Sequence, residues 1–509
     1  MGGTFSEPVP ALLTDGHVGF VLRSYDKLRL LHANKAVYEL VVSIVKELNA
    51  GGGGQEVITE AKYGAVQFRL PGSPFAPNCG RDSAYFGKFF ILRLFEQMNV
   101  IGYDFLSCVD LSRAYDQGTL IFKQGLMSGE RSKKTVIAVA PYSTDKLHMV
   151  NCTDGVVQTI KEAVLASWKP GIKSEGEVSP SDWHLYEIKM KGNPWSSESS
   201  DESLMSRRLI IELIGRLSFI NWKLHATVNI RSGCGNCLFF IYDERHLQDS
   251  SHFAIISPGR WDRLRLIGFD SPALEAARLT ILRFYQKDVS DERYASGVAE
   301  YKLKGYPFSC AAEEAVTARQ LICRLLELLR DRGWDVITAM DLGQKRSFEK
   351  SILVMGRCES ARLKYACIAP ADLDRLYLIN FPHQIGQLLK EAISKYYLPG
   401  VSTEESRDAS SIHEVVLQGP PWSQNSSFNL HARSMLIMLI KELSTYGWKL
   451  VASGDVSAKY VHQENGIDYP IDVQALFFSF NGIPAGTQVP NTNASSVSFA
   501  ELKVCDLEA

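Results

Sequence analysis

The positions of hydrophobic residues along the chain follow one pattern that recurs four times. In the third copy, short apolar runs at 254–257, 264–267 and 300–303 predict strands, and runs at 334–340 and 351–355 predict two more. Helices are predicted after the second and third strands, so each copy has five strands and two helices in the order ββαβαββ. The second helix shows the clearest apolar stripe, made of Ala318, Leu321, Ile322, Leu325, Leu328 and Leu329.

Residues suited to helix ends support these boundaries. Ser271 is predicted to cap the first helix of the third copy, because its hydroxyl can accept a hydrogen bond from an unpaired backbone N–H. Pro272 suits the first turn, where its missing N–H costs nothing. Asn34 can cap the corresponding helix of the first copy, and Gly333 lies where a glycine would end the second helix of the third.

Four short motifs recur in the same order in all copies. Successive aromatic residues of the third motif are 119, 112 and 114 residues apart, and such a nearly constant spacing indicates an internal repeat. The motifs are Asp-basic-Leu (starting at Asp26, Asp145, Asp262 and Asp374), Gly-x-Pro-aromatic (72–75, 192–195, 305–308 and 419–422), an aromatic residue after the second helix (Tyr103, Trp222, Trp334 and Trp448) and a closing apolar pair (121–122, 239–240, 353–354 and 477–478).

The repeat predicts an α+β fold of four tandem homologous units, each a sheet with helices packed on one face. The short connections between copies indicate that neighbouring units touch, while a linear, a curved and a closed array all stay open. The predicted boundaries are a flexible N-terminus at 1–16, unit 1 at 17–125, unit 2 at 133–241, unit 3 at 250–357, unit 4 at 362–480, and a disordered tail at 481–509 that is rich in polar residues, Pro and Gly.

Composition narrows the class of protein. The 509 residues are 45% hydrophobic and 22% charged, which is usual for a globular protein with a sizeable core. The formal net charge of −2 lacks the basic excess of a nucleic-acid binder, so no nucleic-acid partner is expected. No secretory signal or membrane span is evident, and ten irregularly spaced cysteines indicate free thiols. We therefore expect a cytoplasmic protein that is not secreted.

Two local sequences resemble functional motifs but lack the residues that would complete them. The glycine run at 51–54 is followed by Gln55 rather than by the Gly-Lys-Ser/Thr of a phosphate loop, and is interpreted as a linker. Cys234 and Cys237 form half of a zinc-ligand set, and no second pair has suitable spacing. The Gly-Asn between them favours a hairpin turn. No metal or cofactor is expected.

A basic and a polar residue also recur around the third motif. Lys88, Arg207, Arg319 and Arg433 each precede its aromatic residue by fifteen positions, and Asp110, Asn229, Asp341 and Asp455 follow it by seven. One interpretation is an anion-binding site in each unit, since guanidinium groups suit carboxylates and phosphates. The interpretation we favour is structural: an ion pair or a strand-end hydrogen bond that fixes the helix to the sheet.

Other recurring residues are assigned structural roles. Trp222, Trp334 and Trp448 are predicted to be buried between helix and sheet. Pro194, Pro307 and Pro421 are predicted to stop the preceding strand, because proline cannot continue the hydrogen bonding of a sheet. The aspartates of the first motif are predicted to form turns.

The first six residues, Met-Gly-Gly-Thr-Phe-Ser, fit the pattern for N-myristoylation of Gly2. A single acyl chain gives only weak, reversible membrane binding. The sequence thus predicts a non-catalytic tandem-repeat scaffold for protein partners or self-assembly. For its N-terminal segment two interpretations stay open: an unmodified flexible N-terminus, which the permissive pattern favours, and weak peripheral contact at the cytoplasmic face of a membrane through Gly2. Two alternatives stay open, namely a module that binds anions or lipid head groups through the recurring basic residues, and an enzyme with a site between units.

Overall fold

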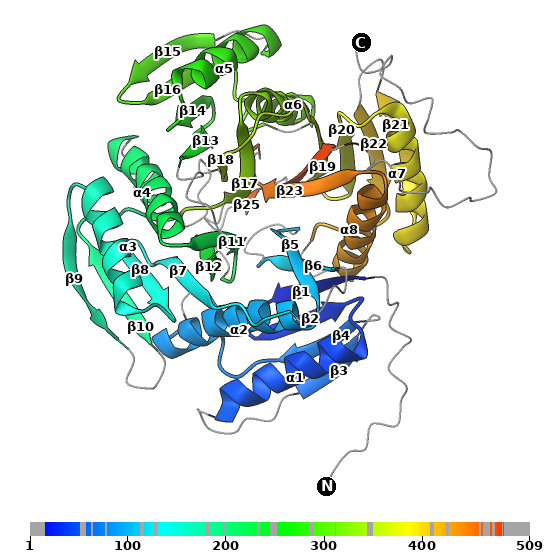
Figure 1. Cartoon of the computed structure of the whole chain (residues 1–509). Helices are drawn as coiled ribbons and strands as arrows, with labels where there is room; N and C mark the ends of the chain where they lie inside the picture. Colours follow the sequence, from blue (N-terminus) through cyan, green and yellow to red (C-terminus); the bar gives the residue numbers. More distant parts are fainter. Residues whose placement is uncertain are drawn as a thin grey trace.

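The repeated pattern folds into four six-stranded antiparallel sheets and eight helices among the described residues of a computed structural model. Each sheet with its two helices is one unit, which confirms the predicted α+β fold of four tandem units (Figure 1). The structure describes residues 16–482 except 51–57, 63–64, 77–78, 112–116, 126–130, 179–183, 197–199, 232–234, 245–251, 286–288, 311, 344–349, 408–411, 424–426, 458–459, 462–468, 471–473 and 481.

Units 1 and 2 follow the same order of elements. Unit 1 consists of β1 (His17–Arg23), β2 (Lys27–Leu31), α1 (Lys35–Ala50), β3 (Ile58–Lys62), β4 (Ala65–Arg69), α2 (Arg81–Val100), β5 (Tyr103–Val109) and β6 (Thr119–Gln124). Unit 2 consists of β7 (Val136–Tyr142), β8 (Lys146–Val150), α3 (Asp154–Ser167), β9 (Ile172–Glu177), β10 (Leu185–Met190), α4 (Ser200–Phe219), β11 (Trp222–Val228) and β12 (Cys237–Tyr242).

Units 3 and 4 repeat this order, and unit 4 carries one extra pair of two-residue strands. Unit 3 consists of β13 (Phe253–Gly259), β14 (Arg263–Ile267), α5 (Ser271–Phe284), β15 (Val289–Ala295), β16 (Val298–Leu303), α6 (Ala312–Asp331), β17 (Trp334–Met340) and β18 (Ile352–Arg357). Unit 4 consists of β19 (Lys364–Ala371), β20 (Arg375–Ile379), α7 (His383–Tyr396), β21 (Val401–Arg407), β22 (Ile412–Leu417), α8 (Phe428–Thr445), β23 (Trp448–Gly454), β24 (Tyr460–Val461), β25 (Tyr469–Pro470) and β26 (Ala475–Phe480).

The predicted order ββαβαββ omits one strand in every unit, and the correct order is ββαββαββ. The missing strands are β3, β9, β15 and β21, each at one edge of its sheet. The sequence of β9, Ile-Lys-Ser-Glu-Gly-Glu, shows why: most of its side chains are exposed, so it lacks the apolar alternation of a half-buried strand. Charged side chains on an edge strand also oppose unwanted pairing with other chains.

Helix ends follow the local sequence, with one correction. Asn34 caps α1 as predicted, since its Oδ1 accepts from the Val37 N–H at 3.0 Å. In α5 the capping residue is Asp270 rather than Ser271, because the Asp270 carboxylate accepts from the Ala273 N–H at 2.9 Å. Ser271 and Pro272 then occupy the first turn.

Each sheet is covered on both faces. In β7, Ile137 and Val139 pack in one cluster with α3 and α4 of the same unit. The alternate residues Ala138 and Ala140 pack in another cluster with α1 and α2 of unit 1. Since side chains alternate along a strand, the second helix of each unit lies between its own sheet and the sheet of the next unit.

This layering continues around the molecule and closes it. The second helix of each unit contacts the first strand of the next unit: α2 lies on β7, α4 on β13 and α6 on β19. The same contact joins the last unit to the first, because α8 lies on β1. The four units therefore form a closed ring with approximate fourfold symmetry (Figure 1).

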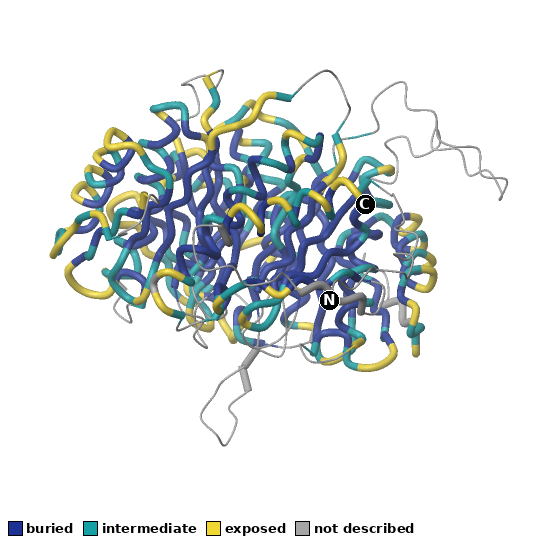
Figure 2. Tube along the Cα trace, turned by 90° about the horizontal axis from the view of Figure 1, so that it is seen from below, coloured by how far each residue is buried: buried dark blue, intermediate teal, exposed yellow. Residues whose placement is uncertain are grey.

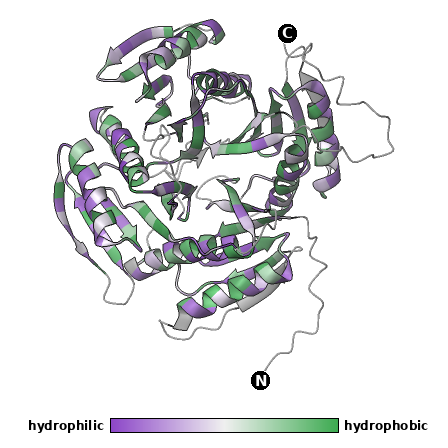
Figure 3. Ribbon diagram, in the orientation of Figure 1, coloured by the Kyte–Doolittle hydropathy of each residue, from purple (hydrophilic) through white to green (hydrophobic). Residues whose placement is uncertain are grey.

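The strands β5, β11, β17 and β23 meet at the centre of the ring, while α1, α3, α5 and α7 lie at its periphery (Figure 1). Each central strand carries a β-bulge, which bends it where it meets its neighbours. Burial is greatest in the layers of strands, and exposed residues gather at the rim (Figure 2). Hydropathy follows the same division, with apolar residues concentrated on strands and on the inward faces of helices (Figure 3).

Candidate functional site

The first two recurring motifs are joined at one end of every unit. The backbone carbonyl of each motif aspartate accepts a hydrogen bond from the end of the strand before the Gly-x-Pro turn. The four turn glycines, Gly72, Gly192, Gly305 and Gly419, all have positive φ, which a glycine adopts without strain. The hydrogen bonds are Leu70 N–H to Asp26 (2.7 Å), Met190 N–H to Asp145 (2.7 Å), Leu303 N–H to Asp262 (2.8 Å) and Leu417 N–H to Asp374 (2.8 Å).

The predicted prolines lie in these turns, and their carbonyls anchor neighbouring side chains. The Pro194 carbonyl accepts from the Ser206 hydroxyl of α4 at 2.5 Å, and the Pro421 carbonyl accepts from Asn429 Nδ2 of α8 at 2.9 Å. The Pro307 carbonyl of unit 3 accepts from the Ser457 hydroxyl of unit 4 at 2.7 Å. The turns therefore contribute both to their own unit and to the contact with the next.

The tryptophans of the third motif are buried, as predicted. Trp222, Trp334 and Trp448 are 8%, 2% and 3% exposed. Each is the first residue of the fifth strand of its unit, which lies at the centre of the ring and follows the turn after the second helix. Their role is to fill the space between that helix and the sheet.

The recurring polar residues lie at the junctions, a term used here for all contacts between one unit and the next. The residue that precedes the last strand of one unit bonds the polar residue that follows the fifth strand of the next. These hydrogen bonds run from Gly118 N–H to the Asn229 carbonyl (2.8 Å), from Asn236 N–H to the Asp341 carbonyl (2.8 Å) and from Ser351 N–H to the Asp455 carbonyl (2.8 Å).

Side chains accept further hydrogen bonds at two of these junctions and at the fourth junction, between units 4 and 1. The Asp341 N–H donates to Asn236 Oδ1 at 3.0 Å, and the Asp455 N–H donates to Ser351 Oγ at 2.8 Å. At the junction of unit 4 with unit 1, the Asp110 N–H donates to Gln474 Oε1 at 3.0 Å. The same two positions of neighbouring units are therefore hydrogen-bonded at all four junctions, including the one that closes the ring.

The recurring basic residues are also buried and also cross the junctions. Lys88, Arg207, Arg319 and Arg433 are all less than a tenth exposed. Each bonds an atom of the following unit: Lys88 Nζ contacts His148 Nδ1 (3.1 Å), Arg207 Nε donates to Ser257 Oγ (2.7 Å), Arg319 donates to the Ser457 carbonyl (3.1 Å) and Arg433 donates to Thr119 Oγ1. These contacts join two units, in addition to any role that the basic residues have within their own unit.

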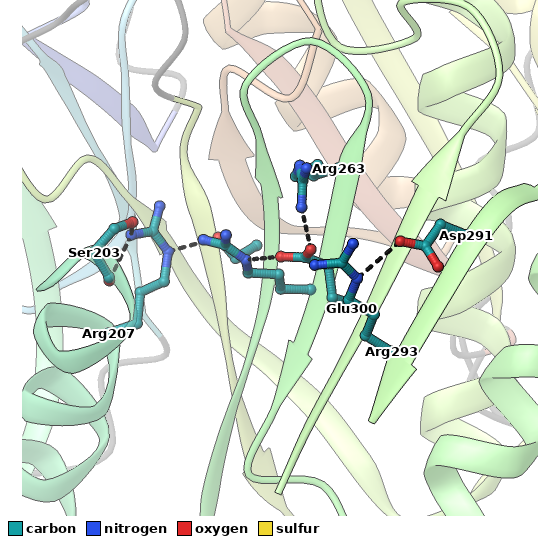
Figure 4. A network of polar contacts seen from close by, with 8 residues as sticks. Ser203, Arg207, Arg263, Asp291, Arg293 and Glu300 are labelled. Atoms are coloured by element: carbon teal, nitrogen blue, oxygen red, sulfur yellow. Dashed lines mark hydrogen bonds and ion pairs between the residues drawn. The ribbon is translucent and has the colours of Figure 1, made fainter. Parts of the chain in front are cut away.

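At the junction between units 2 and 3, Arg207 is part of a larger polar network (Figure 4). Arg207 of α4 is held by Ser203 of the same helix, at 2.8 Å from its carbonyl. On the facing sheet, Glu300 of β16 accepts from Arg263 and, at 2.6 Å, from Arg265 of β14. The cross-strand pair of Arg265 and Glu300 has counterparts in Arg29–Gln67, His148–Glu187 and Tyr377–Glu414.

The junction between units 1 and 2 differs chemically from the other three. It has a lysine, Lys88, where the others have arginine, and a histidine, His148, in the cross-strand pair. His148 Nε2 lies 2.9 Å from Glu187 Oε2, and its ring stacks on Tyr142 at 4.0 Å. The guanidinium of Arg231 lies over the Tyr142 ring, 4.5 Å from its centre.

Burial and nearby charges determine the protonation states of His148 and Glu187. Burial, assisted by the positive charge of Lys88 and Arg231, lowers the pKa of His148 to about 3. The hydrogen bond from His148 and the ammonium of Lys146 lower the pKa of Glu187 to about 2, against the opposing effect of burial. At neutral pH the imidazole is therefore uncharged; its Nδ1 accepts from Lys88, and its Nε2–H donates to the Glu187 carboxylate.

From the sequence, none of His148, Glu187 and Arg231 is identified as a candidate site residue. A signal for His148 was present, because it lies three positions after the motif residue Asp145, where the other units have Arg29, Arg265 and Tyr377. Glu187 could be found only through the strand register, since it faces His148 from β10 across 39 residues of sequence.

Several predicted features lie outside the described residues: Gly2 and its acylation pattern, the glycine run at 51–54, Cys234, and the tail except Gly482. Cys237 is described and begins β12 as a buried thiol. Within the described part of the chain, no group of three His, Cys, Asp or Glu residues could hold a metal ion. No helix described there is long and apolar enough to cross a membrane.

Comparison with known proteins supports the repeat independently of the structure. The model of one domain family matches the chain four times, at residues 18–123, 135–245, 252–355 and 364–479. Because these matches cover more than half of the chain, the protein belongs to that family, as a fourfold repeat of its domain. No curated protein and no solved structure matches the chain.

Proposed function

We propose that this protein is a non-catalytic scaffold that holds protein partners, or further copies of itself, on the outer surface of the four-unit ring. The observation that carries the proposal is the location of the recurring polar residues. They bond one unit to the next inside the ring, so they serve its assembly. Binding of partners is then left to the exposed surfaces, and the four units differ there.

Two neighbouring turns, the one before the motif aspartate and the Gly-x-Pro turn, show this difference clearly. Unit 3 presents Trp261 and Tyr306, which are 53% and 58% exposed, with ring centres 5.9 Å apart. Unit 2 has Thr144 and Asn193 at the same two positions. Tryptophan and tyrosine are enriched among residues that dominate protein–protein binding energy, so the turn of unit 3 is the best candidate for a partner contact.

A pair of matched double variants tests this function. Trp261→Ala with Tyr306→Ala removes the aromatic pair from unit 3, and Thr144→Ala with Asn193→Ala changes the same turns in unit 2. Partners cross-linked to each variant in cells are identified and quantified by mass spectrometry, after circular dichroism has shown that both variants fold. Loss of a residue that dominates binding weakens it by about 30-fold or more, corresponding to about 2 kcal/mol.

The scaffold proposal predicts that the unit 3 variant loses a defined set of partners while the unit 2 variant keeps that set. Identical partner sets for wild type and both variants, together with a monomeric protein by light scattering, would contradict it. Attachment to a membrane through acylated Gly2 is part of the same proposal, with the scaffold at the cytoplasmic face.

A further inference from the structure

A groove lies between the two helices of unit 4, α7 and α8, near their C-terminal ends. Its volume is about 170 Å³, and its apolar lining includes Leu388, Leu389 and Ala392 of α7 and Leu443 of α8. Leu389 and Leu443 are buried, whereas Leu388 and Ala392 are half-buried and therefore partly accessible. Since α7 lies at the periphery of the ring, the groove belongs to its outer surface (Figure 1).

Two tyrosines and two carboxylates also line the groove. Tyr396 and Tyr446 are half-buried, and the Tyr396 hydroxyl donates to Glu442 Oε1 at 2.6 Å. Burial, followed by the charges of Glu442 and Glu391, raises the pKa of Tyr446, so both carboxylates lie close to this ring. Glu442 is half-buried and Glu391 is exposed, which puts the carboxylates at the mouth of the groove.

One basic side chain, Lys395, lines the groove as well. Its Nζ lies 4.7 Å from the centre of the Tyr396 ring. Burial raises the pKa of Tyr396, and a hydrogen bond with Lys395 partly offsets this effect, so the ammonium lies at the tyrosine. With one ammonium and two carboxylates, the lining groups carry one net negative charge. A ligand with one positive charge complements it.

The same positions of unit 2 show which cation fits between these helices. Counted from the motif aspartate and the motif tryptophan, Glu391 and Glu442 correspond to Glu162 and Arg216. The Arg216 guanidinium of α4 donates to the Glu162 carboxylate of α3 at 3.3 Å. In unit 4 a second carboxylate replaces that arginine. The corresponding residues of units 1 and 3 are uncharged, namely Ser43 with Gln97 and Leu279 with Leu328.

We propose that the groove between α7 and α8 binds an arginine side chain of a protein partner, with its guanidinium between Glu391 and Glu442. The aliphatic part of the side chain then covers the apolar lining. Arginine suits the site better than lysine, because its planar fork can bond two carboxylates and stack on a tyrosine ring. This inference rests on the proposed scaffold function and names the chemistry of one partner contact.

The size of the groove favours one side chain of a larger ligand over a free small molecule. Small-molecule sites usually enclose about 300–1,000 Å³, whereas this groove is smaller and reaches the surface. The two ends of this chain outside the described residues match the charge of the groove poorly. Residues 1–15 contain no lysine or arginine, and residues 483–509 contain Lys503 together with Glu501, Asp506 and Glu508. A separate protein is therefore the better source of the cation.

Selection from a library of random short peptides displayed on phage tests the site. Peptides that the full wild-type chain retains and Glu442→Arg does not are sequenced. This substitution recreates the arrangement of unit 2, in which an arginine of the second helix pairs with the glutamate of the first and fills the groove. The selected peptides should share an arginine next to an apolar residue. A selection that does not distinguish the two proteins, or selected peptides without a basic residue, would overturn the proposal.

The affinity of one selected peptide, labelled with fluorescein and followed by fluorescence anisotropy, tests the two carboxylates. Glu391→Gln and Glu442→Gln should each weaken binding about fivefold, which is the effect of a partly exposed ion pair. Glu162→Gln is the matched control, because it removes the carboxylate from the same position of unit 2 and should leave the affinity unchanged. Citrulline in place of the peptide's arginine keeps the shape without the charge, and equal affinity of that peptide would contradict the proposal.

A photoreactive benzoylphenylalanine in place of Leu388 in the full chain identifies the occupant of the groove in cells. Cross-links to a segment of another protein that contains arginine are expected. Cross-links to residues 483–509 of the same chain, or to a second copy of the protein, would overturn the proposal. The aromatic pair of unit 3 is tested separately. Partners lost from its double variant, together with no peptide binding at the groove, would leave the scaffold function in place and remove only this site.

Discussion

Replacement of Trp334 by alanine tests the packing of unit 3 most severely. The indole is 2% exposed, and its Nε1–H points to Asp270 Oδ2 at 3.4 Å. The ring of Phe269 meets it edge-on at 5.0 Å, and the guanidinium of Arg357 lies 5.2 Å from its centre. The substitution therefore removes the side chain that joins the start of α5 to the central strand β17.

The expected loss follows from these contacts. Truncation of a buried aromatic residue to alanine costs about 3–5 kcal/mol. The edge-on contact with Phe269 alone contributes about 0.5–1.5 kcal/mol, and the cation–π contact with Arg357 about 0.5–1 kcal/mol. These contributions overlap with the packing cost, so we expect about 4 kcal/mol in total. Trp261→Ala is the control, because that tryptophan is 53% exposed and its loss should change stability by less than about 0.5 kcal/mol.

Equilibrium unfolding in urea, followed by far-UV circular dichroism, measures both variants against wild type. The midpoint should fall for Trp334→Ala and stay almost constant for Trp261→Ala, with similar slopes for all three proteins. A loss below about 1 kcal/mol for Trp334→Ala, which is typical of a surface position, would refute the packing described for β17.

Three further predictions concern other parts of the molecule. In Gly454→Ala the new Cβ would lie 2.9 Å from the Ala339 Cβ and 3.0 Å from the Ser351 Cβ, so urea unfolding should show a loss of about 1–3 kcal/mol, whereas Gly155→Ala, with no atom within 4 Å, should not destabilise the fold. Because burial lowers the folded-state pKa of His148 to about 3, below the unfolded value, the stability of the wild-type protein should fall as the pH drops from 6.5 toward 3. The stability of His148→Gln should fall less over this range. An equally steep fall for the variant would mean that His148 is charged in the folded protein. If Gly2 is acylated, the intact mass of the protein from eukaryotic cells should exceed the sequence mass by one myristoyl group, with membrane association lost in Gly2→Ala; an unmodified protein recovered wholly in the soluble fraction would remove the membrane part of the proposal.

The architecture of single units was largely accessible from the sequence. The turns at the four glycines with positive φ depend on a few neighbouring residues, and so does the burial of the tryptophans. The edge strands were missed because a strand such as β9 is exposed and polar, and its main stabilisation is backbone pairing with β10. Backbone pairing leaves little trace in the side-chain pattern.

Closure of the ring was less accessible, since it depends on residues far apart in the chain. One indication was present: the runs at the first strands, such as Val-Ile-Ala-Val-Ala from 136, are apolar at every position rather than at alternate positions. Such runs are typical of strands buried on both faces. The candidate site was inaccessible for the same reason, because Lys88, His148 and Arg231 meet only when unit 1 packs on unit 2.

Hydrogen exchange of the junction amides tests the closed ring most directly. The N–H groups of Asn236 and Ser351 join units 2 to 3 and 3 to 4, and the N–H of Asp110 joins unit 1 to Gln474 of unit 4. Exchange resolved to single residues by mass spectrometry should show Asp110 as strongly protected as Asn236 and Ser351, because the fourth junction is formed like the others. Rapid exchange at Asp110 with protection retained at the other two amides would show that the four units form an open array.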